Sequence, residues 1–138
     1  MTSQELLNLS IRGFTPQTYG SDDVAKKIKL RDVIKSKIDD LSLVQRNCKG
    51  KKLAVDVCFN LFSATSELGR KTKDLDNLLK ILLDTLPEYM DRAKTNEGLG
   101  LLPDDRDDLI FQINCKKNLV SNESEEGIDL KVYEYVEN

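Results

Sequence analysis

The residues best suited to chemistry lie near the middle of the chain, where Asp74 and Asp76 precede Lys80. A helix is predicted from about Asn77 to Leu86, because leucine and isoleucine fill most positions and Pro87 follows. One polar stripe, an arc of about 100° on a helical wheel, interrupts its apolar surface. The stripe carries Asp76, Asn77, Lys80 and Asp84. Asp74 lies in the extended segment that enters the helix and can reach the same place.

Further carboxylates immediately precede a predicted strand, at Asp104, Asp105, Asp107 and Asp108. Carboxylates that converge without histidine or cysteine form an oxygen-donor site, which suits Mg²⁺ or Mn²⁺ rather than zinc. Such an ion orients an attacking water and stabilises the charge that builds on a phosphate. A lysine among the acids stabilises the same charge. The pattern therefore favours metal-dependent phosphate chemistry.

The same residues also have a purely structural interpretation. Asp76 is placed to cap the predicted helix, and Lys80 is spaced to form ion pairs with Asp76 and Asp84 one turn away on either side. The downstream acids would then coat a surface loop. Spacing alone leaves both interpretations open.

Composition excludes several classes of site. The 138 residues include no histidine, which excludes Ser-His-Asp and Cys-His nucleophiles and His-ligated zinc. The three cysteines form no CxxC pair, so neither a disulfide framework nor a zinc ribbon is expected. No apolar run approaches the roughly 18 residues of a membrane span, and the first residues do not resemble a signal peptide. We expect an intracellular, cytoplasmic protein without a membrane partner.

Charge is distributed unevenly about a net value of −3, with a basic first part (residues 1–55) and an acidic remainder. This asymmetry hints at a surface for a polyanion and a carboxylate-rich centre, although uneven surface charge is the simpler interpretation. Lys26, Lys29 and Lys37 are expected to form the solvated face of a helix, with nucleic-acid contact as the second interpretation.

The elements that position these residues follow from the apolar periodicity. Strands are predicted at residues 7–12, 53–62, 109–115 and 128–136. Helices are predicted at about 21–41 and 77–86, residues 63–73 are expected to form a basic loop, and 122–127 a hairpin turn. The order β-α-β-α-β-β predicts a single α+β domain over residues 1–138, with two main helices packed on a mixed sheet.

The motif D-x-D-N-L-x-K-x-x-x-D at residues 74–84 is followed by Asp104-Asp105-Arg106 and an alternating strand that ends in Lys116. This combination resembles the RusA family of Holliday-junction resolvases, and the order of elements resembles that family over nearly the whole chain. The resemblance implies a RusA-like fold and a small homodimeric, Mg²⁺-dependent endonuclease. Its expected substrate is branched DNA, a four-way junction cut symmetrically in recombination and repair.

The resemblance also implies roles for individual residues. Asp74, Asp76 and one of Asp104 and Asp105, with Asp105 preferred, would be metal ligands, and Lys80 would be the catalytic lysine. Asn77 and Asp84 would support the site. Mg²⁺ is the expected cofactor, with Mn²⁺ as a substitute.

The loop Phe14–Tyr19 lacks the basic residues usual in that family. Because phosphate binding needs lysine or arginine, the residues directly before the motif are the expected DNA contacts: Arg70, Lys71 and Lys73. The alternative from another class is a non-catalytic module on the same fold that binds nucleic acid or a cation and has a vestigial site.

Overall fold

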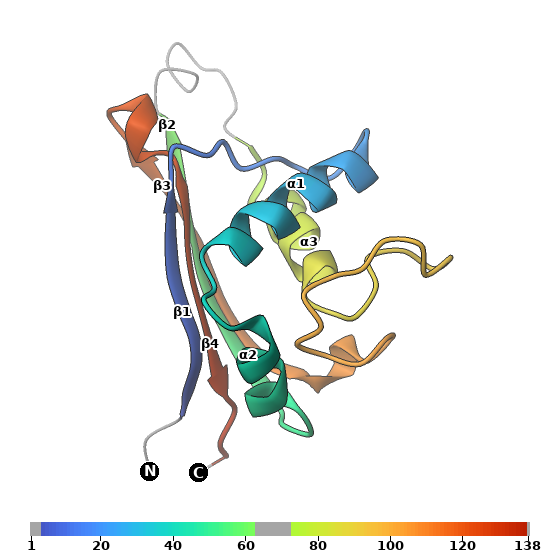
Figure 1. The fold of residues 1–138 in the computed structure, drawn as a ribbon. Coiled ribbons are helices and arrows are strands. Elements are labelled where there is room, and N and C mark those ends of the chain that lie inside the picture. Colours follow the sequence, from blue (N-terminus) through green and yellow to red (C-terminus); the bar gives the residue numbers. More distant parts are fainter. Residues whose placement is uncertain (1–3, 63–72, 138) are drawn as a thin grey trace.

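The computed structural model describes residues 4–62 and 73–137. Its elements are, in chain order, β1 (Glu5–Arg12), α1 (Asp23–Ser36), α2 (Leu41–Cys48), β2 (Leu53–Phe62), α3 (Leu75–Thr85), β3 (Ile110–Val120) and β4 (Gly127–Glu134). Two short 3-10 turns, η3 (Asp107–Leu109) and η4 (Glu123–Glu125), flank β3. Figure 1 shows the mixed α+β architecture that the sequence predicts. The expected basic loop lies outside the described residues except for Lys73.

The four strands form one mixed sheet in the order β1-β4-β2-β3. β4 runs antiparallel to both β1 and β2, whereas β3 runs parallel to β2. The hairpin predicted at residues 122–127 is therefore wrong, because β2 lies between the two strands that this segment connects. A parallel β2–β3 pair requires a crossover connection, and the segment containing α3 provides it.

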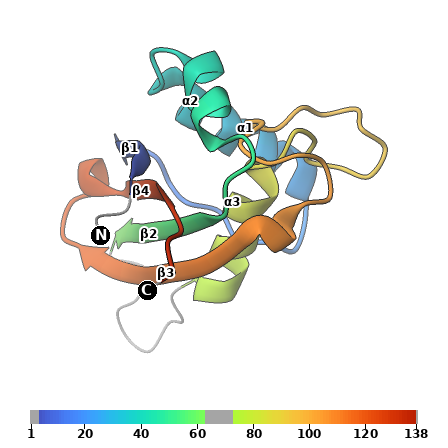
Figure 2. The same cartoon turned by 90° about the horizontal axis from the view of Figure 1, so that it is seen from below.

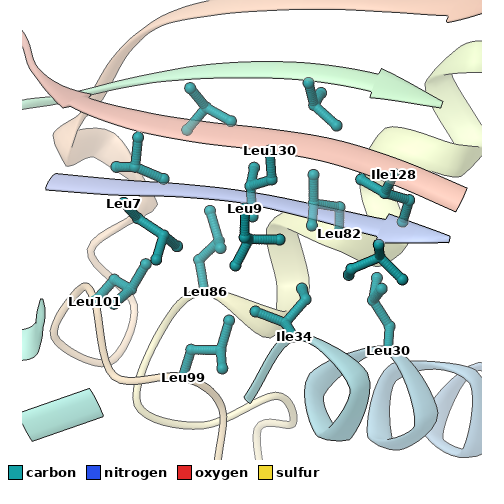
Figure 3. Close-up of a cluster of buried hydrophobic side chains, with 14 of the residues drawn as sticks. Leu7, Leu9, Leu30, Ile34, Leu82, Leu86, Leu99, Leu101, Ile128 and Leu130 are labelled. Carbon is teal, nitrogen blue, oxygen red and sulfur yellow. The ribbon is translucent and has the colours of Figure 1, made fainter. Parts of the chain in front are cut away.

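The helices α1, α2 and α3 all lie on one side of the sheet (Figures 1 and 2). The alternation of β2 explains this arrangement, because Leu53, Val55 and Val57 are buried toward the helices and Asp56 is exposed on the opposite face. Figure 3 shows the resulting core, in which side chains of α1 and α3 meet those of the sheet. Its buried members include Leu9, Ile34, Leu82 and Leu130.

The first helix, predicted at residues 21–41, ends at Ser36, and α2, which was not predicted, begins at Leu41. The amide groups of Lys37 and Ile38 donate hydrogen bonds to the carbonyl oxygens of Ile34 and Lys35, and α1 ends here. Asp40 then caps α2, accepting a hydrogen bond from the Leu43 amide at 3.1 Å. The apolar stripe runs across this break, so periodicity alone did not reveal it. The structure therefore has three α-helices in its described part rather than two main ones.

The connection from α3 to β3 folds back along the end of α3 and adds to the core. Amide groups of Leu99 and Leu101 donate to the carbonyl oxygens of Thr85 and Leu86, at 2.7 and 2.8 Å. Both leucines are buried beside Leu86 (Figure 3). A side chain at Gly98 would meet the Pro87 carbonyl oxygen, with a Cβ only 2.1 Å away. These contacts fix residues 98–102 at the C-terminal end of α3.

Candidate functional site

The predicted site residues Asp74, Asp76 and Lys80, here called the acid–lysine group, lie along the first turns of α3. Asp74 is the N-cap residue in extended conformation, but its side chain makes no capping hydrogen bond. Asp76 lies in the first turn, where a helix N-terminus favours negative charge. Both carboxylates are exposed, and neither has a hydrogen-bond or ion-pair partner among residues 4–62 and 73–137. Neither acid is therefore used as a cap.

Lys80 does not form the ion pairs of the structural interpretation. Its ammonium lies 3.7 Å from the centroid of the Tyr19 ring. Asp84, one turn further along, is bound instead by Lys27 of α1, with an N–O distance of 2.9 Å. The polar stripe of α3 thus serves two purposes. Asp84 ties α3 to α1, whereas Lys80 keeps its charge at the surface, beside an aromatic ring.

The loop Phe14–Tyr19 is fastened to the start of α3. The Tyr19 amide donates to the Asn77 carbonyl oxygen at 3.1 Å. The Lys73 ammonium donates to the carbonyl oxygen of Pro16 at 2.6 Å. Asn77 therefore contributes through its backbone, by holding Tyr19 in place beside Lys80.

Lys73 is half-buried, whereas a lysine that serves only to contact DNA would be exposed. Burial lowers the pKa of its ammonium, and nearby Lys26 lowers it further, although Glu126 acts in the opposite direction. The Lys117 ammonium donates to the Lys73 carbonyl oxygen at 3.1 Å, so the residue is also linked to the far end of β3. The other two predicted DNA contacts, Arg70 and Lys71, lie outside the described residues.

Four lysines contact one short stretch of this loop, residues 16–19. Lys26 donates to the Thr18 carbonyl oxygen at 2.7 Å, and Lys27 lies 5.8 Å from the Tyr19 centroid. Lys73 and Lys80 complete the set. Lys26 was expected on a solvated face but is half-buried here. Sequence reasoning missed this cationic group and Tyr19, because their contacts join segments far apart in the chain.

The downstream acids lie at the other end of α3. Asp104 follows the segment held against Leu86 and pairs with Lys94 at 3.3 Å. Asp105 is exposed, with a left-handed φ of 59°. α3 has 11 residues, which corresponds to a length of about 16 Å. The structure therefore does not bring Asp104 or Asp105 of the same chain to the acid–lysine group.

No group of three or more Cys, Asp or Glu side chains in the described part of the chain is arranged to hold a metal ion. Asp108 is paired with Arg106 at 2.9 Å, a contact that lowers the pKa of Asp108 and raises that of Arg106. Asp107 precedes it in η3 and is exposed. What the acid–lysine group offers by itself is two unpaired carboxylates and one ammonium.

The face of the sheet opposite the helices carries a second polar region, centred on Asp129 of β4. Its carboxylate accepts hydrogen bonds from Ser10 at 2.8 Å, Arg12 at 3.2 Å and Asn60 at 3.1 Å. Burial acts to raise the pKa of Asp129, but these hydrogen bonds and the Arg12 charge outweigh it and lower the pKa. Asn118 of β3 extends the network to Asn60. These groups satisfy one another across all four strands.

Compared with known proteins, the chain matches no protein-family model, no curated protein and no solved structure. In the ranges 4–62 and 73–137, no helix has the length and apolar character needed to cross a bilayer.

Proposed function

We propose that this protein is a Mg²⁺-dependent, structure-specific endonuclease of the RusA-like type, acting on four-way DNA junctions as a homodimer in recombination and repair. The observation that carries the proposal is the state of Asp74 and Asp76. Both are exposed at the start of a helix, and neither carboxylate is used for capping or ion pairing within the described residues.

The oxygen donors of the acid–lysine group suit Mg²⁺ better than zinc. Mg²⁺ is commonly bound by one or two carboxylates, with water and substrate phosphate completing its shell. Asp74 and Asp76 supply two carboxylate groups as donors, and the chain has no histidine, the residue that would favour zinc. When bound, the ion would supply positive charge to the phosphate and orient a water; Mn²⁺ would substitute for it.

The surrounding cations support a phosphate ligand. Lys80 lies one turn beyond Asp76, and no carboxylate of residues 4–62 and 73–137 forms an ion pair with it. We assign it to stabilise negative charge on the phosphate during hydrolysis. Lys26 and Lys73 hold the loop that carries Tyr19, which positions Lys80. Asp84 supports the site by tying α3 to α1 through Lys27.

The direct test is incubation of the purified protein with a labelled four-way junction and a matched linear duplex, in Mg²⁺, in Mn²⁺ and in chelator. We expect symmetric cuts in the junction, in either metal and not in chelator. The double variant Asp74→Asn/Asp76→Asn, purified identically, controls for contaminating nucleases. A junction that is bound but never cut, in either metal, overturns the proposed activity.

One observation favours the alternative of a non-catalytic binding module. Asp104 is paired with Lys94, and neither it nor Asp105 reaches the acid–lysine group of the same chain. In that case the junction would bind with equal affinity in Mg²⁺ and in chelator, and the double variant would bind as tightly as the parent.

A further inference from the structure

The face of the sheet opposite the helices, here called the open face, carries side chains in rows across the strands (Figure 2). Successive rows lie about 7 Å apart along the strands, because every second residue points to the same face. Three neighbouring rows are, in the order β4, β2 and β3: Tyr133, Ala54 and Gln112; Lys131, Asp56 and Asn114; and Asp129, Cys58 and Lys116. The open face therefore changes from aromatic to cationic along the strands.

A cavity of about 200 Å³ lies at the aromatic end of the open face. Its lining includes two residues with side-chain amides, Gln112 and Asn114, and two half-buried tyrosines, Tyr133 and Tyr135. Phe111 extends the aromatic surface, since its ring centroid lies 5.3 Å from that of Tyr135. Aromatic rings beside amide groups are what proteins use to stack and hydrogen-bond an unpaired nucleobase.

Two acidic residues, Asp56 and Glu134, also line this cavity. Asp56 is exposed, and its carboxylate has no hydrogen bond or ion pair within residues 4–62 and 73–137, although Lys131 is its neighbour in the row. A carboxylate only accepts hydrogen bonds, so it suits a base with an exocyclic amino group, such as cytosine. Uracil has a carbonyl oxygen at that position and would be repelled.

A larger cavity, of about 700 Å³, adjoins the first and shares Asp56 with it. Its other two carboxylates already have partners within the protein. Asp129 pairs with Arg12 at 2.9 Å, and Glu125 accepts a hydrogen bond from the Asn122 amide at 3.3 Å. The negative charge of this cavity is therefore largely used by the protein itself.

Two lysines line the larger cavity, Lys116 and Lys131. Both are exposed, and neither forms an ion pair in the described part of the chain. They lie one and two rows beyond Tyr133, about 7 and 13 Å along the strands. A nucleic-acid strand with one base against Tyr133 can therefore bring the phosphates that follow to both lysines.

We propose that the open face binds single-stranded nucleic acid, with an unpaired base in the cavity at Tyr133 and the backbone over Lys131 and Lys116. Aromatic rings beside a cationic groove are the usual means of holding a single strand. A double helix keeps its bases stacked inside and cannot present one to the ring. A cationic peptide would suit the rings and acids of the first cavity, but both lysines would repel it in the second.

The open face and α3 lie on opposite sides of the sheet (Figures 1 and 2). The binding of a single strand therefore goes beyond the proposed nuclease activity and does not rest on it. The tests below are made in chelator and measure binding alone, so their outcome is separate from that of the cleavage assay.

Stacking is tested by fluorescence anisotropy with a dye-labelled deoxycytidine oligonucleotide of about 12 nucleotides, within the range that single-strand binding sites cover. Tyr133→Leu should weaken binding by about fivefold or more, because the stacked base loses its ring. The matched control is Tyr89→Leu, since Tyr89 is also half-buried but lies in the connection after α3. A parent that does not bind, or a folded Tyr133→Leu variant that binds like the parent, overturns the proposal.

Phosphate contact is tested by the salt dependence of the same binding. Lys116→Gln/Lys131→Gln should make the plot of log affinity against log salt shallower by roughly 0.7 for each phosphate released. Tyr133→Leu should keep the parent slope, because a stacked base carries no charge. Lys29→Gln/Lys35→Gln removes the same charge from exposed positions of α1 and should leave the slope unchanged. Equal slopes for the two lysine variants place the strand elsewhere, and this pair decides the question if Tyr133→Leu does not fold.

The choice of base is tested with deoxycytidine and deoxyuridine oligonucleotides of equal length, whose bases differ at the exocyclic amino group. The parent should bind the deoxycytidine strand more tightly, and Asp56→Asn should narrow the difference. Equal affinities for the parent overturn the role of Asp56. A labelled oligolysine peptide tests the competing partner. If the parent binds this peptide and Tyr133→Leu does not, while neither oligonucleotide binds, the open face receives a cationic protein segment and the proposal is overturned.

Discussion

The ammonium of Lys80 lies 3.7 Å from the centroid of the Tyr19 ring, while Asp84, one of the two carboxylates expected to pair with it, is bound by Lys27. An exposed cation–π contact contributes about 0.5–1 kcal/mol. That is enough to favour one position of a flexible side chain but leaves its charge unneutralised. Lys80 is thus held in place by an uncharged ring, and its positive charge remains available to a phosphate.

Lys80→Met tests this availability. Methionine keeps an apolar stem against the ring and removes the charge. If Lys80 stabilises charge in the transition state, single-turnover cleavage should fall by about 10² or more, which corresponds to the loss of one stabilising group. The melting temperature and the junction affinity should change little. Lys29→Met, on the exposed face of α1, is the control. Equal cleavage by both variants would leave Lys80 with a structural role alone.

Asp76→Asn separates metal binding from folding. The Asp76 carboxylate has no partner within the described residues, and it adds to the negative charge beside Asp74. Removing it should leave the metal-free protein equally stable or slightly more stable, because like charges repel. Cleavage should be lost and Mg²⁺ binding weakened, with junction binding retained. Melting curves in chelator and in Mg²⁺, beside a cleavage assay, measure this. Cleavage at the parent rate would remove this carboxylate from the metal site.

Arg70→Gln/Lys71→Gln tests the predicted DNA contacts without disturbing Lys73, whose ammonium holds Pro16. The plot of log affinity against log salt should become shallower by roughly 0.9 for each phosphate that the variant no longer binds. Lys35→Gln/Lys49→Gln removes the same charge from exposed positions on and beyond other helices. This control should leave the slope unchanged. An unchanged slope in the first variant would exclude both residues from the interface.

Asp129 predicts a pH dependence of stability. Its pKa is lowered in the folded state, despite burial, by hydrogen bonds from Arg12, Ser10 and Asn60. The contribution of ionised Asp129 to the free energy of unfolding is therefore complete above the unfolded-state pKa, about 3.9 for aspartate. It is lost as pH falls through the lower pKa of the folded state. In urea unfolding, the free energy of unfolding should decline less between about pH 6 and 3 for Asp129→Asn than for the parent. Asp39→Asn should follow the parent, and identical declines for all three would contradict the prediction.

The sequence predicts well those elements whose burial follows from their own residues. β2 was predicted at 53–62 and is observed as Leu53–Phe62, because its alternation matches a sheet covered on one face. α3 was predicted from about Asn77 and begins at Leu75. The mixed α+β class is also confirmed.

Features that depend on distant partners were not predictable. The alternation at Phe111 and Ile113 suggested half-buried positions, yet both are exposed because β3 lies at the edge of the sheet. The sheet order is set by pairing across the whole chain. In the same way, Asp104 resembles a ligand by spacing, but its position follows from the contacts that hold Leu101 against the end of α3.

The interior position of β4 has a consequence for synthesis on the ribosome. A nascent chain that has emerged as far as Phe62 contains β1 and β2, which are the two neighbours of β4, but not the strand that joins them. Ile128, Leu130 and Val132, all completely buried, emerge last. Until then β1 and β2 each have an edge awaiting β4, open to wrong partners. The edges of β1 and β2 that pair with β4 therefore stay unpaired until β4 has been synthesised, and they need protection from aggregation until then.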